Sequence, residues 1–261
     1  MTDKILTERD GDIARIIFNQ PEKRNAVSLE MWQAVEAALT EFAKDDSIRV
    51  LILSGAGGRA FVSGADISKF ESERASEAGV ANYNATTKRV YDLVEGFDKP
   101  TIAQIDGFCI GGGVALSLCC DIRICGKGSN FAVPAAKLGL GYGFEGINRL
   151  VNVVGPSFAK EIFFTARRFN AEEARMMGLV NRVVADDQVA SAAAEMAAMI
   201  GANAPMTVNS VKFIVGETLK DESARDLPAC ADRVKQCFDS KDYIEGRRAF
   251  LEKRKPQFVG S

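Results

Sequence analysis

The sequence predicts an α/β core followed by a helical C-terminal part. Short apolar runs typical of buried strands alternate with helical patterns as far as about Val184, which is the pattern of α/β domains. Strand signals stop after Asp186, and the remainder of the 261 residues has helical patterns. We therefore expect two domains, a core over residues 1–200 and a helical region over residues 201–261.

The elements expected in the core follow in chain order. Ile5 to Glu8 and Ile13 to Phe18 predict a hairpin with its turn at Asp10-Gly11. Ser28 is the expected N-cap of a helix whose apolar residues recur at helical spacing. Further strands are expected at Val50 to Leu53, Thr101 to Ile105 and Ile122 to Cys125, and a further helix at Tyr83 to Phe97.

Two other stretches complete the expected organisation. Glu71 to Gly79 is charged and aperiodic, which is typical of a mobile surface loop. Helical patterns in the C-terminal part cover Val189 to Ile200, Pro205 to Leu219, Ser223 to Phe238 and Asp242 to Lys253.

Charge and hydropathy exclude several kinds of partner. The formal net charge is -2, so the chain lacks the basic excess that nucleic acids and anionic membranes attract. No apolar run approaches the length that spans a bilayer. The charged first ten residues lack the apolar core of a signal peptide. We expect a cytoplasmic protein.

The chain contains no histidine, which restricts its chemistry. Ser-His-Asp catalysis, Cys-His catalysis and histidine-ligated metals are excluded. The six cysteines form no C-x-x-C pair and are interpreted as reduced core residues, so we expect neither disulfides nor a bound metal. Acid–base chemistry must therefore use Asp, Glu, Lys, Tyr or Cys.

Three segments of the chain are rich in glycine. Gly141 to Gly146 matches G-x-G-x-x-G, but no buried strand precedes it, which favours a turn over a dinucleotide site. Phe61 to Ile67 and Gln104 to Gly113 also contain glycines that permit close backbone approach. The second leads directly into an apolar helix, whose free N–H groups suit developing negative charge. For either segment alone, a tight turn that packs backbone against backbone is the better explanation.

Taken together, Phe61 to Ile67 and Ile110 to Gly113 resemble the two oxyanion-hole segments of the crotonase (enoyl-CoA hydratase/isomerase) superfamily. The resemblance continues through Asn19 to Ala26, Lys99-Pro100, Cys120 to Arg123, Ala174 to Asn181 and Phe250 to Pro256. It implies a crotonase-like spiral of ββα units with a C-terminal helical trimerisation region, assembled as a homotrimer or a dimer of trimers. It also implies an acyl-CoA thioester as partner, with coenzyme A as part of the substrate and no separate cofactor.

The resemblance also implies roles for individual residues. The backbone N–H groups of Ala65 and Gly112 would form the oxyanion hole, which stabilises the enolate of a thioester where its charge develops. The positions that would contact coenzyme A are Arg24, Ala26, Ser63, Asp66, Ile67, Ile110, Pro134, Phe250 and Lys253. Basic side chains suit phosphates, although any single surface lysine is better explained as a solvated charge.

The departures from the family pattern concern acid–base chemistry. Hydratases of the family have glutamates where this chain has Ala115 and Ala135. Tyr142 has a counterpart in methylmalonyl-CoA decarboxylase, although that enzyme has a histidine at the position of Ala65 and a glutamate at that of Ala115. We expect Tyr142 to orient the acyl group or its carboxylate and Glu145 to act as acid or base. A packing aromatic and a carboxylate favoured by a helix N-terminus are the structural alternatives.

Two functions are consistent with this sequence. One is an acyl-CoA lyase or isomerase that works through an enolate, with decarboxylation, isomerisation, hydrolysis or an atypical hydration as the candidate reactions. The other is a catalytically silent acyl-CoA-binding protein that has kept the fold and lost its acids.

Overall fold

Two β-sheets with surrounding helices form the core, as a computed structural model of residues 2–69, 73 and 75–261 shows. The larger sheet has the strand order β1 (Ile5–Asp10), β2 (Ile13–Phe18), β3 (Val50–Gly55), β5 (Thr101–Ile105), β7 (Ile122–Gly126) and β10 (Arg182–Val184). β1 and β2 form an antiparallel hairpin, and every further pairing in this sheet is parallel. The predicted α/β class and hairpin are confirmed.

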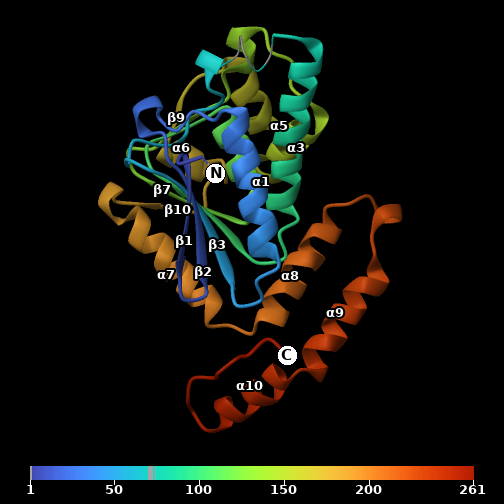
Figure 1. Cartoon of the computed structure of the whole chain (residues 1–261). Helices are drawn as coiled ribbons and strands as arrows, with labels where there is room; N and C mark the ends of the chain where they lie inside the picture. Colours follow the sequence, from blue (N-terminus) through green and yellow to red (C-terminus); the bar gives the residue numbers. More distant parts are fainter. Residues whose placement is uncertain (1, 70–72, 74) are drawn as a thin grey trace.

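Helices cover both faces of the larger sheet. The helices of the core are α1 (Leu29–Ala43), α3 (Glu77–Glu95), α4 (Gly112–Cys119), α5 (Phe144–Thr165), α6 (Ala171–Met176) and α7 (Val189–Gly201). Figure 1 shows α1 and α3 side by side on one face and α7 on the other. Successive strand residues point to opposite faces, so on β3 Leu51 joins the cluster with α1, whereas Ile52 joins the cluster with α7. Burial on both faces explains the unbroken apolar run of this strand.

A second, smaller sheet was not predicted from the sequence. It consists of β4 (Ala60–Val62), β6 (Phe108–Ile110), β8 (Asn130–Ala132) and β9 (Phe169–Asn170). β6 lies inside the glycine-rich segment from Gln104 to Gly113, where no strand between Ile105 and the helix was predicted. Strands of two or three residues are too short to show a period-2 pattern, because an alternation of apolar and polar residues can be recognised only over four or more residues.

Two predicted boundaries are wrong. The expected loop from Glu71 to Gly79 includes the start of α3, because the Ser76 side chain accepts a hydrogen bond from Gly79 N–H and caps the helix. Residues 71, 72 and 74 of that loop lie outside the described residues. The helix expected from Ser223 begins later, at Leu227, where Asp226 caps it and Pro228 occupies the first turn.

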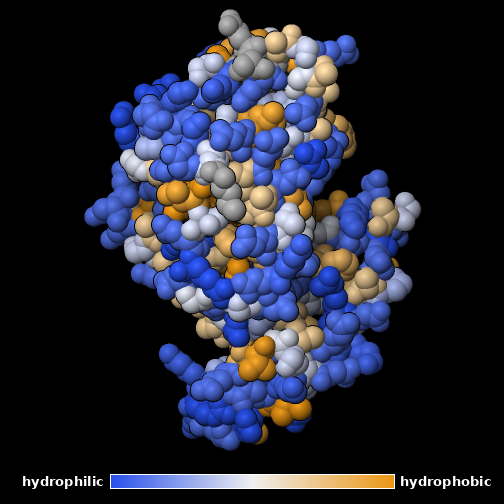
Figure 2. All heavy atoms as spheres, in the orientation of Figure 1, coloured by the Kyte–Doolittle hydropathy of each residue, from blue (hydrophilic) through white to orange (hydrophobic). Residues whose placement is uncertain are grey.

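The C-terminal part differs from the core in its exposure. Its helices are α8 (Pro205–Thr218), α9 (Leu227–Asp239) and α10 (Lys241–Leu251), and Figure 1 shows α9 and α10 extending away from the core. Large apolar side chains stay exposed on them, namely Val211, Val215, Leu219, Leu227, Val234, Phe238, Ile244, Phe250 and Leu251. Apolar atoms accordingly reach the surface at the lower end of the molecule in Figure 2. One chain alone leaves these faces uncovered.

Candidate functional site

Parallel pairing in the smaller sheet brings the two predicted oxyanion segments together. In β4 and β6, Ala60 pairs with Phe108 and Val62 with Cys109. The segments that leave these strands, carrying Ala65 and Gly112, therefore emerge at the same edge of the sheet. A Cβ added to Gly112 would lie 3.8 Å from the Cα of Gly64, so the two segments are in contact.

Glycine is required at two positions of this junction. Gly64 has a φ of +105°, a conformation that side chains with a Cβ rarely adopt. A Cβ on Gly113 would lie 2.1 Å from the carbonyl oxygen of Val62, which is far inside contact distance. The close approach of α4 to β4 thus depends on Gly113 lacking a side chain.

The amide of Ala65 is directed away from its neighbouring strand segment. Val27 N–H donates to Gly64 O at 2.8 Å, and Asp66 N–H donates to Val27 O at 3.0 Å. Successive peptide groups of an extended segment point in opposite directions, so the Ala65 N–H faces the other side. Ala65 is partly exposed.

The amide of Gly112 is one of the unsatisfied donors at a helix start. Gly112 is the first residue of α4, where no earlier helical carbonyl can accept its N–H. Among the residues that the structure describes, no protein acceptor bonds the N–H of either Gly112 or Ala65. Two free amides beside the positive end of a helix dipole can stabilise an oxygen on which negative charge develops.

Asp66 holds the segment that carries Ala65. Its carboxylate is 4% exposed and accepts hydrogen bonds from Lys23 Nζ at 2.9 Å and from Ser68 Oγ at 2.6 Å. Burial raises the pKa of Asp66, but the hydrogen bonds from Lys23, Ser68 and Gln20 outweigh it and lower the pKa to about 2. The side chain is therefore occupied by protein donors, and its position suits anchoring better than contact with a ligand.

Several of the predicted coenzyme A contacts surround this segment. Ser63 Oγ donates to Lys23 O at 3.4 Å, which joins the segment to the loop of Arg24 and Ala26. The Arg24 guanidinium lies 5.0 Å from the ring centroid of Phe108, on the strand that also carries Ile110. Ile67 is 72% exposed. Pro134 begins the 3₁₀ helix η3 (Pro134–Leu138) directly after β8, the neighbour of β6.

Phe250 and Lys253 are not brought to this place within one chain. Both lie at the end of α10, which packs against α9. Figure 1 shows α10 at the bottom of the view, whereas β9 of the smaller sheet lies at the upper left. A contact of these two residues with the same ligand molecule would require a neighbouring copy of the chain.

Tyr142 and Glu145 differ in their surroundings. The Tyr142 ring makes an edge-to-face contact with the ring of Phe163, with 4.8 Å between the ring centroids, and it also packs against Gly146. Burial raises the pKa of the Tyr142 phenol. Its hydroxyl has no hydrogen-bond partner among the described residues. Glu145 is exposed in the first turn of α5, where a carboxylate is favoured by the helix dipole. The surroundings therefore favour Tyr142 over Glu145 as a site residue.

The face of α4 that carries Gly112 also lies near the phenols of Tyr91 and Tyr142. Gly112, Ala115 and Cys119 are spaced at i, i+3 and i+7 and so share a face. The hydroxyl of Tyr91, on α3, donates to Gly112 O at 3.3 Å. Cys119 lies near enough to both Tyr91 and Tyr142 to raise the pKa of each further. The alanine at position 115 thus lies on the face that the two tyrosines border.

Tyr91 was not predicted from the sequence to be a site residue. It occupies a partly buried position in an expected helix and belongs to no motif. Only the packing of α3 against α4 brings its hydroxyl to Gly112.

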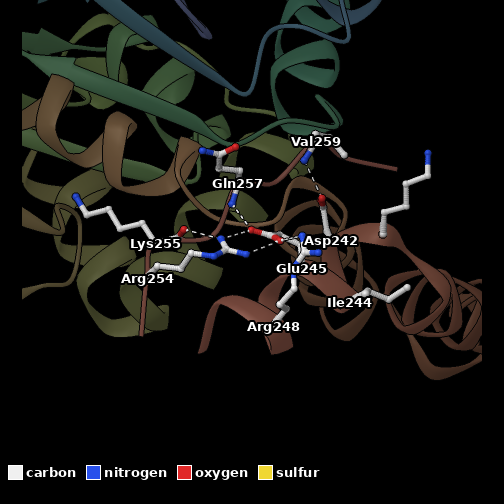
Figure 3. A pocket seen from close by; sticks show the side chains of 9 residues that line it. Asp242, Ile244, Glu245, Arg248, Arg254, Lys255, Gln257 and Val259 are labelled. Atoms are coloured by element: carbon white, nitrogen blue, oxygen red, sulfur yellow. Dashed lines mark hydrogen bonds and ion pairs between the residues drawn. The ribbon is translucent and has the colours of Figure 1, made fainter. Parts of the chain in front are cut away.

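A cavity in the C-terminal part is separate from these residues. It has a volume of about 520 Å³ and is lined by α10 and the segment that follows it. Figure 3 shows that ion pairs occupy it, since Arg254 and Arg248 both donate to Glu245, and Val259 N–H donates to Asp242. The side chains of Asp242, Glu245, Arg248 and Arg254 thus already have protein partners.

The described part of the chain contains neither a membrane-spanning helix nor a cluster of metal ligands. Within residues 2–69, 73 and 75–261, no helix is long and apolar enough to cross a membrane. Over the same residues, no cluster of three Cys, Asp or Glu side chains is suited to holding a metal ion.

Known proteins resemble the chain over nearly its whole length. A family model described as enoyl-CoA hydratase/isomerase matches residues 8–261. The crotonyl-CoA hydratase of Syntrophomonas wolfei is 35% identical over 257 residues, covering 98% of both chains. The carnitinyl-CoA dehydratase of Salmonella agona is 32% identical over 266 residues, covering 100% of both. A crystal structure of an enoyl-CoA hydratase/carnithine racemase from Magnetospirillum magneticum matches with a TM-score of 0.94 and 36% identity, covering 100% of this chain and 97% of that one.

Proposed function

The chain belongs to the enoyl-CoA hydratase/isomerase family, and from this premise we propose that it converts an acyl-CoA thioester through an enolate bound by the amides of Ala65 and Gly112. The observation that carries the proposal is the pair of free amides at one edge of the smaller sheet, beside the start of α4. A thioester carbonyl gains negative charge on its oxygen as the enolate forms. Removing one preorganised donor from such a site typically costs about 3 kcal/mol of transition-state stabilisation.

The names of the relatives support the class of substrate. Crotonyl-CoA and carnitinyl-CoA, which appear in the names of the Syntrophomonas and Salmonella relatives, are both acyl-CoA thioesters. A backbone oxyanion site recognises the thioester that these compounds share, because its donors contact the carbonyl oxygen and not the acyl chain. The acyl group is therefore selected elsewhere in the site.

The reaction that we propose is not an efficient hydration. Ala115 and Ala135 occupy the positions at which hydratases of the family have glutamates, and alanine can neither activate water nor donate a proton. General acid–base catalysis contributes roughly 100- to 10,000-fold per group. Decarboxylation suits the remaining groups better, because loss of carbon dioxide produces the enolate without a base.

A catalytically silent acyl-CoA-binding protein is the second candidate. The two alanines and the absence of histidine favour it. It predicts tight binding of acyl-CoA with no chemical change.

The experiment that separates these functions is a substrate screen. The protein would be incubated with crotonyl-CoA, malonyl-CoA and methylmalonyl-CoA, and the products followed by mass spectrometry, with binding measured by calorimetry. We expect binding of all three and turnover of at least one carboxylated thioester. Binding without any product would establish the silent function, and absence of binding would contradict both.

The exposed faces of the C-terminal helices favour self-association. We propose a homotrimer or a dimer of trimers in the cytoplasm, in which the apolar side chains of α8 to α10 are covered by neighbouring copies. This arrangement would also give Phe250 and Lys253 access to a ligand bound to another copy. Sedimentation at micromolar concentration tests it, because a monomer there would contradict the proposal.

A further inference from the structure

We propose that Tyr91 is a catalytic residue that delivers its phenolic proton to the α-carbon of the thioester enolate, in place of a missing glutamate. This inference rests on the proposed function, since it requires an enolate at the amides of Ala65 and Gly112. It adds a residue from α3, an element that supplies none of the site residues predicted from the sequence.

The first observation is the distance of the phenol from the oxyanion donors. Tyr91 Oη lies 3.3 Å from Gly112 O and 3.4 Å from the position that a Cβ on Gly112 would take. Standard bond lengths then place Oη within about 6 Å of the Gly112 nitrogen. The α-carbon of a thioester lies two bonds from its carbonyl oxygen, so a thioester bound to that amide has its α-carbon in the same part of the site as the phenol.

The second observation is how firmly the ring is held. The ring of Trp32 makes an edge-to-face contact with the ring of Tyr91, with 5.6 Å between the ring centroids. Trp32 is itself held in place, because its Nε1 donates to Tyr83 Oη at 3.0 Å. The Arg149 guanidinium lies 6.0 Å from the Tyr91 ring centroid and is fixed by ion pairs with Asp92 and Glu95. A proton donor that is fixed in this way needs little reorganisation during the reaction.

The third observation concerns the charge state of the phenol. Burial raises the pKa of Tyr91 well above its usual range, and Tyr142, Cys119 and Tyr83 add to this effect while Arg149 opposes it. The group is therefore protonated at neutral pH, as an acid must be. The positive charge of Arg149 favours the tyrosinate that remains after the proton has left.

Position distinguishes Tyr91 from Tyr142. Tyr91 contacts Gly112, the residue that supplies an oxyanion donor, whereas the ring of Tyr142 contacts Phe163 and Gly146 of α5. We therefore assign orientation of the acyl group to Tyr142 and protonation to Tyr91.

The step balances without any further reactant. With methylmalonyl-CoA, the bond between the α-carbon and the carboxylate breaks, carbon dioxide leaves, and the electron pair forms the enolate. The Tyr91 O–H bond then breaks, the proton bonds the α-carbon, and the thioester carbonyl re-forms. Water returns a proton to the tyrosinate.

The test follows deuterium from D₂O into the α-position of the product. Wild type, Tyr91→Phe and the control Tyr243→Phe would be compared on methylmalonyl-CoA, malonyl-CoA and crotonyl-CoA. Tyr243 lies on α10, is 41% exposed and is not one of the proposed site residues, so its variant matches the chemical change away from the site of its own chain. Turnover, binding affinity and the stereochemistry of deuterium at the α-carbon would be measured.

Tyr91→Phe is expected to reduce turnover by about 100-fold or more and to leave the acyl-CoA dissociation constant within about threefold. Its residual product is expected to carry deuterium on both faces, because solvent then protonates the enolate. Wild type and Tyr243→Phe are expected to give one stereoisomer. A purely structural role of Tyr91 would change binding or melting temperature and keep a single stereoisomer.

The inference is overturned if Tyr91→Phe keeps its rate and stereochemistry while wild type is active, and the proposed function then stands. It is also overturned if no thioester acquires α-deuterium from wild type, and the enolate of the proposed function then fails with it.

Discussion

The proposed site has a donor half, formed by the amides of Ala65 and Gly112, and a proposed acid–base half, with Tyr91 and Tyr142 beside Ala115 on one face of α4. The donor half consists of backbone, and strand pairing and close packing hold it in place. The acid–base half consists of side chains, which can be exchanged without moving that backbone. A chain can therefore keep the means of binding an enolate while it changes how protons reach it.

The largest expected effect comes from removing one amide of the donor half. Gly112→Pro deletes the N–H at the first position of α4, a place where proline is compatible with a helix. Loss of one donor is expected to reduce turnover by about 100- to 1,000-fold. Steady-state kinetics on the best thioester of the screen would measure this.

Gly112→Ala serves as the matched variant, since it keeps the N–H. Its Cβ would lie 3.4 Å from Tyr91 Oη and 3.8 Å from Gly64 Cα, which are ordinary contact distances. We expect a loss of about tenfold at most, from slight misplacement. Equal losses in both variants, at unchanged melting temperature, would show that the amide has no catalytic role.

Introducing carboxylates into the acid–base half would test the comparison by adding a function instead of removing one. The double variant Ala115→Glu with Ala135→Glu is expected to gain about 100-fold in hydration of crotonyl-CoA, because the donor half is already present. Both positions are buried, at 9% and 5% exposure, so the new carboxylates should also lower the melting temperature.

Ala136→Glu controls for the added charge at an exposed neighbouring position. Disappearance of the enoyl absorbance would be followed for both proteins. A folded double variant with no more hydration than the control would contradict the division of the site into two halves.

A smaller effect is expected at Tyr142. Tyr142→Phe keeps the contact with Phe163 and removes a hydroxyl that bonds no other described residue, so the fold should tolerate it. We expect turnover to fall by about tenfold through poorer orientation of the acyl group. Full turnover on the true substrate would remove Tyr142 from the mechanism.

The smallest effect on turnover is expected at Asp66, which supports the donor half without contacting the substrate. Its pKa falls from 3.8 to about 2 in the folded protein, which corresponds to about 2 kcal/mol of stabilisation at neutral pH. Because the folded pKa is the lower one, this stabilisation is present above about pH 4 and is lost as the pH falls towards 2.

Chemical denaturation of wild type and Asp66→Asn between pH 2 and 7 would measure this contribution. The variant should be less stable at pH 7, and the difference should shrink as the pH falls below 4. A difference that stays constant with pH would show that the charge of Asp66 does not stabilise the fold.

The sequence was sufficient for the elements with strong patterns. The apolar run of β3 and the capped start of α1 at Ser28 were predicted from local signals. Ala65 and Gly112 were identified by resemblance, and the structure adds the pairing of β4 with β6 that explains their proximity. Tyr91 could not be found, because its role depends on how two helices pack. The anchoring role of Asp66 depends likewise on Lys23, a residue distant in the sequence.

The most direct test of the account is the carbonyl stretching frequency of a thioester bound to the protein. Infrared difference spectra with a ¹³C-labelled carbonyl would isolate this band and would require no turnover. Two amides that donate to one oxygen should lower the frequency relative to the thioester in water, and Gly112→Pro should reverse most of that shift. An unshifted band from a ligand that is bound to wild type would contradict the oxyanion site.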